Sequence, residues 1–155
     1  MKGKAFALLF SWLLIIVCIN GELPPSVYND WKKSAQEVLH IRVTKIKPTR
    51  DIGLGKEGCV SEKWLNIDAE VLRIERTASQ SDDHEGVKAI NVGDTVNFES
   101  YFRDEIDGCY GWAGPSPPIA LKEHNCYVAY MNRTGRRNPL LELAAGGKSF
   151  ERITN

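Results

Sequence analysis

Two stretches of the chain alternate between apolar and polar residues, which is typical of half-buried β-strands. The first begins at Trp64, and its apolar face consists of Leu65, Ile67, Ala69 and Val71. The second covers 95–102 and alternates in the same way. The polar run 80–86 between them cannot bury enough apolar surface to fold, so we expect a solvated loop there. Gly93 and Asp94 favour a turn into the second strand.

The alternation in the first stretch changes phase once. After Val71, the apolar positions continue at Leu72 and Ile74, on the opposite parity. One inserted residue is what a β-bulge supplies, and a bulge lets a long strand bend. We therefore predict a bulge at Val71–Leu72 and a curved strand.

Three further segments are rich in strand-forming residues: 38–46, 127–131 and 140–143. Pro48 either ends the first of them or places its end on a sheet edge, and 49–57 is expected to be a loop. Five strands in so short a chain, without a convincing helical pattern, favour an all-β fold. The arrangement that removes exposed edges at this size is a closed five-stranded Greek-key barrel.

The domain boundaries follow from these segments. The barrel is predicted to cover 38–150, with a short polar tail at 151–155. Residues 22–37 form a lead-in, and its first part, Glu22-Leu-Pro-Pro-Ser26, should be extended because of its prolines. Within it, 31–37 is expected to be a short helical turn or a bridge into the first strand.

The order of these segments resembles the OB-fold domains of the netrin-like superfamily, which includes the tissue inhibitors of metalloproteinases. The resemblance covers about Val38 to Phe150 and rests on V-G-D-T-V at 92–96, L-K-E-H-N-C-Y-V-A-Y at 121–130 and L-L-E-L-A at 140–144. It implies an OB-type barrel. In the inhibitors, a cysteine at the mature N-terminus chelates the protease zinc, so the resemblance implies metalloproteinase inhibition only if Cys18 becomes the first residue. Asn20 stands where the paired second cysteine is expected.

The first 21 residues have the features of a cleaved secretory signal peptide. Two lysines precede an apolar run at 5–17, and Gly21 supplies a small residue before the cleavage point. The apolar run is shorter than the roughly 20 residues of a membrane span, so we expect a secreted protein with no membrane span. An alternative is lipid attachment at Cys18, which would make a periplasmic or lipid-anchored envelope protein with a structural role, although Val17 is not the small residue that such a signal requires.

Charge and motif content exclude several classes of function. The 155-residue chain has 20 basic and 20 acidic residues, and removal of the leader leaves a net charge of −2. This balance lacks the basic stripe of a nucleic-acid-binding protein. The three histidines (His40, His84 and His124) have no metal-ligand spacing, and no phosphate-binding loop or nucleophile elbow occurs. We therefore expect no enzyme, no metal and no cofactor.

Cysteines and a glycosylation sequon add covalent candidates. In an oxidising compartment we expect a disulfide, and Cys109–Cys126 is our first choice, with Cys59–Cys109 as the rival. The spare thiol is expected to be buried or inert, or else to pair with another chain. Asn132 begins an Asn-Arg-Thr sequon that we place in a turn after the fourth strand.

The strongest candidate for binding is the loop Asp104–Pro118, which concentrates aromatic residues, glycines and prolines. Tyr110, Trp112 and Pro115 would form a rigid apolar platform, with Tyr101 on the neighbouring strand. Alternatively, Tyr110 and Trp112 cap the barrel, and Trp64 is expected in the core. The sequence therefore predicts a secreted, non-enzymatic binding module with an unknown protein or glycan partner.

Overall fold

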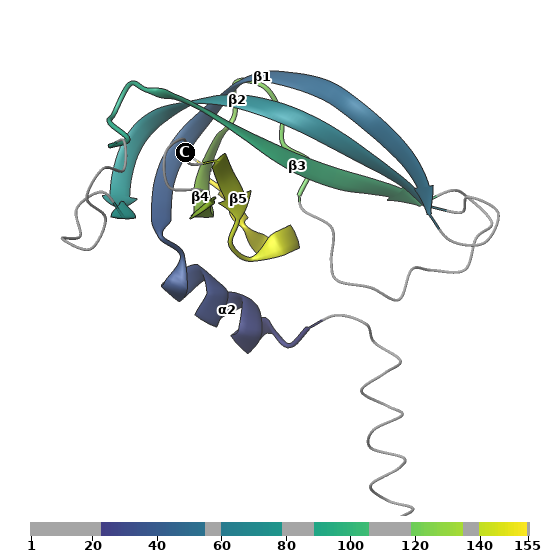
Figure 1. Ribbon diagram of the computed structural model, residues 1–155, viewed down its shortest axis with the longest axis horizontal. Helices are drawn as coiled ribbons and strands as arrows, with labels where there is room; N and C mark the ends of the chain where they lie inside the picture. The colour runs from purple at the N-terminus through teal and green to yellow at the C-terminus, as the bar shows by residue number, and fades with distance from the viewer. Residues whose placement is uncertain (1–22, 55–59, 79–88, 106–118, 135–139, 155) are drawn as a thin grey trace, which may run out of the picture.

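Six strands form one sheet that closes on itself (Figure 1). The computed structural model describes residues 23–54, 60–78, 89–105, 119–134 and 140–154. Its elements are α2 (Pro25–Ser34), β1 (Glu37–Leu54), β2 (Val60–Arg76), β3 (Thr95–Glu105), β4 (Cys126–Thr134), β5 (Leu140–Leu143), the 3₁₀ turn η3 (Gly146–Lys148) and β6 (Phe150–Arg152). The strand order is β1-β2-β3-β5-β4-β6, and β1 also pairs with β4, which closes a ring of five strands.

The ring is a mixed barrel. The strands β3 and β5 meet in parallel at Phe98 and Leu141, whereas the other pairs are antiparallel. The protein is thus mostly β with a closed five-stranded barrel, as the alternation of the sequence predicts. The barrel core collects apolar side chains of all six strands together with Leu121, which precedes β4: Leu39, Ile41, Val43, Leu65, Ile67, Ala69, Val71, Val96, Phe98, Leu121, Tyr127, Ala129, Met131, Leu141 and Phe150.

The predicted bulge in β2 is confirmed. His40 pairs with Arg73 and Ile41 pairs with Val71, so Leu72 is the extra residue on β2. Ile41 and Val71, which pair with each other on one side of the bulge, are both fully buried in the core. The extra residue therefore explains the change of phase in the apolar pattern, and it accompanies the bend of β2 around the barrel.

The first strand is longer than the sequence predicts. Residues 49–54, expected in a loop, continue β1 to Leu54, and Pro48 lies inside the strand. Within the described residues, β1 pairs with β4 only over 37–42, so one edge of β1 is open where Pro48 occurs, beside a further register shift. Proline is tolerated at such an edge because no ladder hydrogen bond is lost there. The edge alternative for Pro48 is therefore the correct one.

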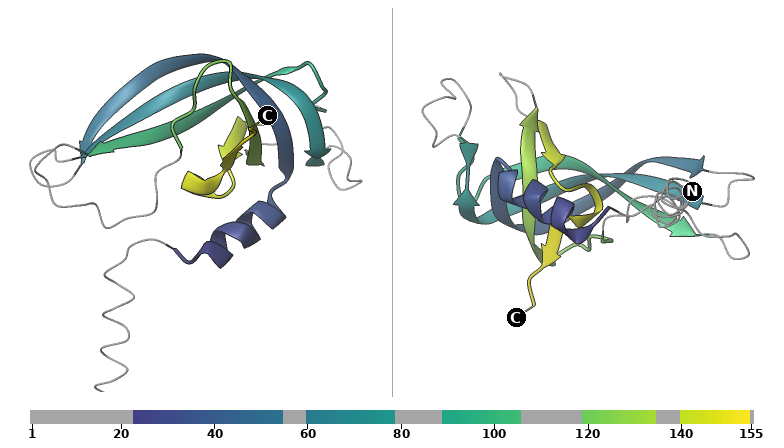
Figure 2. Two further views of the ribbon diagram at one scale, coloured as in Figure 1. Left: turned by 180° about the vertical axis from the view of Figure 1, so that it is seen from behind. Right: turned by 90° about the horizontal axis from the view of Figure 1, so that it is seen from below.

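The lead-in contains a helix, so the extended segment predicted over 22–26 is wrong at Pro25 and Ser26, whereas the helical alternative for 31–37 is confirmed as far as Ser34. Pro24 has an extended backbone (φ −54°, ψ 143°), and Pro25 occupies the first helical position of α2. A proline is favoured at that position because its missing N–H has no helical partner there and its φ is already suitable. The helix lies against one end of the barrel, near the C-terminal segment (Figure 2).

The C-terminal tail is also corrected, because 150–152 forms β6, which pairs with β4 on the edge opposite β1. Phe150 pairs with Ala129, and its ring is 4% exposed. In addition, β4 continues to Thr134, which places Asn132 inside the strand opposite Glu142 and not in a turn. Finally, Gly93 adopts φ +89° in the predicted turn before β3, which only glycine adopts without strain.

Candidate functional site

The strands β1, β2 and β3 continue beyond the barrel as a three-stranded ribbon (Figure 1). Pairing of β1 with β2 runs to Leu54 and Val60, and pairing of β2 with β3 runs to Glu105. By contrast, β3 contacts β5 in register only at Phe98. We call the part formed by 46–54, 60–67 and 98–105 the ribbon. Leu65, Ile67 and Phe98 belong to the barrel core, but the other side chains of the ribbon lie outside the core cluster, so this is where the fold can present residues to a partner.

Three side chains form a cross-strand row on the ribbon. Arg50, Trp64 and Tyr101 are direct register neighbours on β1, β2 and β3. The Arg50 guanidinium lies over the Trp64 ring, 4.1 Å from its centroid. The rings of Trp64 and Tyr101 have centroids 5.3 Å apart and are tilted by 32°. Cation–π and ring contacts of this kind stabilise one another, so the row is an ordered surface feature. We call it the Trp64 row.

A buried carboxylate holds the row in place. Trp64 donates from Nε1 to Glu62 Oε1 at 2.7 Å, and Arg103 donates from Nε to Glu62 Oε2 at 2.9 Å. The side chains of Glu62 and Arg103 are each 12% exposed. Charge-assisted bonds between buried partners are stronger than exposed ion pairs. The guanidinium of Arg103 also lies 5.5 Å from the Tyr101 ring centroid, so Glu62 orients both aromatic residues of the row.

Charges around the row are balanced. Arg50 faces Glu99 at 3.9 Å, and Lys47 faces Asp68 at 3.6 Å on the same side of the sheet. Farther toward the barrel, Arg42 is paired with Glu70. Each cation on this side of β1 thus has an acidic neighbour on β2 or β3.

The opposite side of the ribbon carries a hollow of about 420 Å³. Its lining includes the apolar side chains of Pro48, Leu65 and Phe102 together with the charged residues Asp51 and Lys63. Lys63 is bound to Asp104 at 2.6 Å and lies over the Phe102 ring. The ribbon therefore offers two different surfaces, of which only the Trp64 row presents stacked aromatic and guanidinium groups.

Raising the pH above 10 should destabilise the fold through Tyr101. Burial is the main cause that raises the pKa of Tyr101, Glu62 and Tyr28 raise it further, and Arg103 opposes them. An unfolded tyrosine ionises near pH 10, so stability that is fully present below this pH falls as the pH rises through the higher pKa of the folded state. Tyr101→Phe should flatten this fall in urea unfolding measured across alkaline pH. An unchanged slope would contradict the prediction.

The sequence-predicted site residues divide into two groups. Tyr101 belongs to the Trp64 row, whereas Tyr110, Trp112, Pro115 and Cys109 lie outside the described residues. The apolar platform expected in the loop Asp104–Pro118 therefore stays a prediction. Trp64 was expected in the core but is half-buried on the face of β2 opposite the core. The row was missed because its members are spread over three strands, and only their register joins them.

Two of the residues predicted to be covalently modified, Cys126 and Asn132, lie within the described residues. Cys126 is half-buried at the start of β4 with a free thiol within the described part of the chain. Its predicted partner lies outside that part, so the disulfide stays a prediction. Asn132 accepts a hydrogen bond from the Gln36 N–H at 3.2 Å through Oδ1. Across the ranges that the structure covers, no group of three or more His, Cys, Asp or Glu residues could hold a metal ion.

Comparisons with known proteins found no match. No protein family, no curated protein and no solved structure matches it. In the described ranges, no helix is long and apolar enough to cross a membrane. The function must therefore be argued from the geometry of the ribbon.

Proposed function

We propose that this protein is a secreted, non-enzymatic binding module that recognises a protein partner through the Trp64 row. The observation that carries the proposal is the ordered stack of Arg50, Trp64 and Tyr101 over a buried Glu62–Arg103 pair. Tryptophan, tyrosine and arginine are the residues most enriched in the energetic centres of protein interfaces. A stack that is ordered before binding also loses less conformational entropy when the partner arrives.

The geometry favours a protein over a glycan as the partner. A sugar ring that stacks on tryptophan needs a free aromatic face. Here the Arg50 guanidinium lies over the Trp64 ring, and Tyr101 packs against that ring from the other neighbouring strand. The row therefore presents ring edges and a half-exposed guanidinium, which suit backbone carbonyls and carboxylates of a protein surface.

The recognition surface is proposed to extend into the loop Asp104–Pro118, which begins at the end of β3. Arg103 and Tyr101 of β3 directly precede this loop in the chain. Tyr110, Trp112 and Pro115 would then add apolar contacts beside the row, with Cys109 available for the disulfide to Cys126. An intact mass measured with and without reduction would detect this bond.

We also propose that the barrel is of the Greek-key OB type. Support comes from the order β1-β2-β3-β5-β4, the additional β1–β4 pairing and the parallel contact of β3 with β5. In OB barrels the face of the second and third strands is a common binding surface, and Trp64 and Tyr101 lie on these two strands. The proposed inhibition of metalloproteinases needs Cys18 at the mature N-terminus, which the same intact mass would decide.

Replacing Arg50 and Tyr101 together by alanine should remove partner binding while the barrel stays folded. The test is cross-linking capture from the extracellular fluid of the native host, followed by affinity measurement with the identified, purified partner. We expect a loss of at least about 30-fold, because two members of one hot spot together contribute about 2 kcal/mol or more. Circular dichroism would show that the fold is retained.

The matched control is Arg42→Ala, since Arg42 lies on the same strand and its side chain is 47% exposed, close to the 52% of Arg50. This variant should bind the partner as tightly as the natural protein. Equal affinity of all three proteins would refute the proposed surface. Unfolding of the double variant would show instead that the row has a structural role, and Arg50→Ala alone would then decide the question.

A further inference from the structure

The hollow on the core-facing side of the ribbon joins an apolar floor to a charged end. Its volume of about 420 Å³ lies within the range of ligand pockets. Leu65 and Phe102, on neighbouring strands, form the floor together with Pro48, which is the register partner of Leu65. Leu65 belongs to the barrel core and Phe102 packs against it, so the fold holds this floor in place. The ribbon thus presents a preformed apolar surface beside charged groups.

The charged end of the hollow carries two carboxylates and one ammonium group. Asp51 and Phe102 are the register partners of Lys63 on its two sides, so these three side chains share one face of the ribbon. Lys63 turns toward β3, where it binds Asp104 at 2.6 Å and lies over the Phe102 ring. Among the described residues, Asp51 has no ion pair, and its one hydrogen-bond donor is Ser61, which donates to Oδ1. The second carboxylate oxygen of Asp51 is therefore available to a cation that enters the hollow.

The electrostatic field at this end of the hollow favours a cation. The hydrogen bond and the charge of Asp104 are the main causes that raise the pKa of Lys63, desolvation opposes them, and the charge of Asp51 raises the pKa further. Arg50 also borders the hollow, but its guanidinium lies over the Trp64 ring on the opposite face. Two carboxylates and one ammonium group leave the core-facing side with a negative balance.

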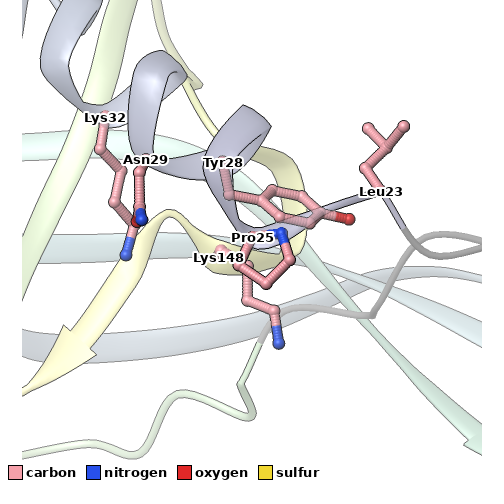
Figure 3. A pocket seen from close by; sticks show the side chains of 6 residues that line it. All are labelled: Leu23, Pro25, Tyr28, Asn29, Lys32 and Lys148. Carbon is pink, nitrogen blue, oxygen red and sulfur yellow. The ribbon is translucent and has the colours of Figure 1, made fainter.

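A smaller pocket of about 210 Å³ lies between α2 and η3 (Figure 3). In Figure 3 the Tyr28 hydroxyl points toward Leu23, away from the ammonium groups of Lys32 and Lys148. Lys32 is already bound to Glu151 at 2.6 Å. The polar groups of this pocket therefore do not converge on one ligand, whereas those of the ribbon hollow border a common apolar floor.

We propose that the ribbon hollow receives a lysine side chain of the protein partner, with its stem on the apolar floor and its ammonium group on Asp51. The inference rests on the function proposed above, because the lysine belongs to the partner that the Trp64 row recognises. Lysine suits the site better than arginine, since a single available carboxylate oxygen serves one ammonium group but not a bidentate guanidinium. Lysine also keeps its aliphatic stem on apolar surface while its charged end stays near water.

One partner can reach both faces of the ribbon around the edge of β1. Arg50 and Asp51 are adjacent in the chain, so their side chains point to opposite faces of the strand. In the described part of the chain, β1 pairs with β4 only over 37–42, so no strand flanks this edge at 50–51. A partner that contacts Arg50 on one face can therefore place a lysine beside Asp51 on the other.

The test uses the natively processed protein and n-pentylamine, which reproduces the lysine side chain from Cα outward, at neutral pH and constant ionic strength. Backbone amide NMR shifts of residues 49–51, 63–65 and 102 report binding. We expect saturable shifts and a dissociation constant of about 10 mM or tighter, because so small a ligand gains little free energy. Pentan-1-ol, which has the same stem without the charge, and pentylguanidine should both bind more weakly.

Two variants and one matched control isolate the site. Asp51→Asn should weaken n-pentylamine at least about 3-fold, as expected for one exposed ion pair, while Ser61 can still donate to the amide oxygen. Lys63→Gln should tighten binding by a similar factor, because it removes a competing ammonium group from the Phe102 ring. An unfolded variant would not bind more tightly. Asp30→Asn, which removes an exposed carboxylate on α2, should leave the affinity unchanged.

Several results would overturn the inference: no saturable n-pentylamine shifts, equal affinity of Asp51→Asn and the natural protein, or equal binding of pentan-1-ol. Tighter binding of pentylguanidine would exclude lysine as the occupant. With the purified partner, Asp51→Asn should also lose at least about 3-fold in affinity, and an unchanged affinity would overturn the inference while the Trp64 row still stands. The proposed function fails separately if replacement of Arg50 and Tyr101 leaves partner affinity unchanged while n-pentylamine still binds.

Discussion

Glu37→Ala should lower the free energy of unfolding by about 3–5 kcal/mol, because it removes the carboxylate of a buried ion pair. Glu37 is fully buried at the start of β1, and Arg133 of β4 donates to its Oε1 from a side chain that is 5% exposed. The same oxygen accepts the Ala78 N–H at 3.0 Å, after β2. One carboxylate thus joins three segments where the barrel closes. Urea unfolding at neutral pH measures the loss.

The comparison that separates burial from charge is Glu70→Ala. Glu70 is paired with Arg42 in a neighbouring part of the same sheet, but the side chains of Arg42 and Glu70 are 47% and 34% exposed to solvent. This variant should change stability far less, because solvent screens an exposed pair. The double variant Glu37→Met with Arg133→Met should recover most of the stability lost in Glu37→Ala, since no buried charge remains. A loss below about 1 kcal/mol for Glu37→Ala would contradict the assigned role.

The bodies of the strands could be predicted from the sequence, because alternation is a local property. Ile67 and Ala69 of β2 and Val96 and Phe98 of β3 each lie between two polar residues, and the extra Leu72 is visible as a change of phase. Glu37 could not be predicted as buried. A glutamate before an apolar segment has the pattern of a surface residue, and its partner Arg133 is 96 positions away.

The Trp64 row was hidden for a related reason. The register Val43–Ala69, continued without interruption, would place Glu62 opposite Arg50. Extra residues at Thr44 and Thr49 on β1 shift this register, so that Arg50 meets Trp64 instead. The bulge at Thr49 leaves no clear mark on the apolar pattern, because the ribbon is exposed there and polar residues occur on both faces. Tyr101 could be singled out as an aromatic residue near the loop, but its neighbours could not.

The helix α2 and the strand β6 show how short segments escape prediction. Two prolines favoured an extended lead-in, although Pro25 at the first turn is compatible with a helix. In the tail, the three residues of β6 are too few to show an alternation of apolar and polar positions. Phe150 is the one apolar residue among them, and a single apolar residue does not predict a strand. Both segments are held by contacts distant in sequence: Lys32 of α2 binds Glu151 of β6 and lies over the Tyr130 ring of β4.

Phe150→Ala should therefore destabilise the barrel by about 3–5 kcal/mol, as removal of a buried aromatic side chain does elsewhere. The Phe150 ring stacks on Phe98 of β3 with centroids 5.7 Å apart and meets the edge of Tyr127 at 6.4 Å. Its loss would open a cavity between strands from both sides of the barrel. Urea unfolding measures the effect, and Phe150→Leu should lose less because it refills part of the space.

Arg152→Ala is the matched control, since Arg152 lies on the same short strand with an exposed side chain. It should change stability by no more than about 0.5 kcal/mol. A comparable loss for both variants would mean that pairing of β6 with β4, and not the ring of Phe150, provides the stability. A negligible loss for Phe150→Ala would place the C-terminal segment outside the cooperative fold. If Phe150→Ala is much less stable than Arg152→Ala, β6 stabilises the barrel mainly through the packing of Phe150 on Phe98 in the core.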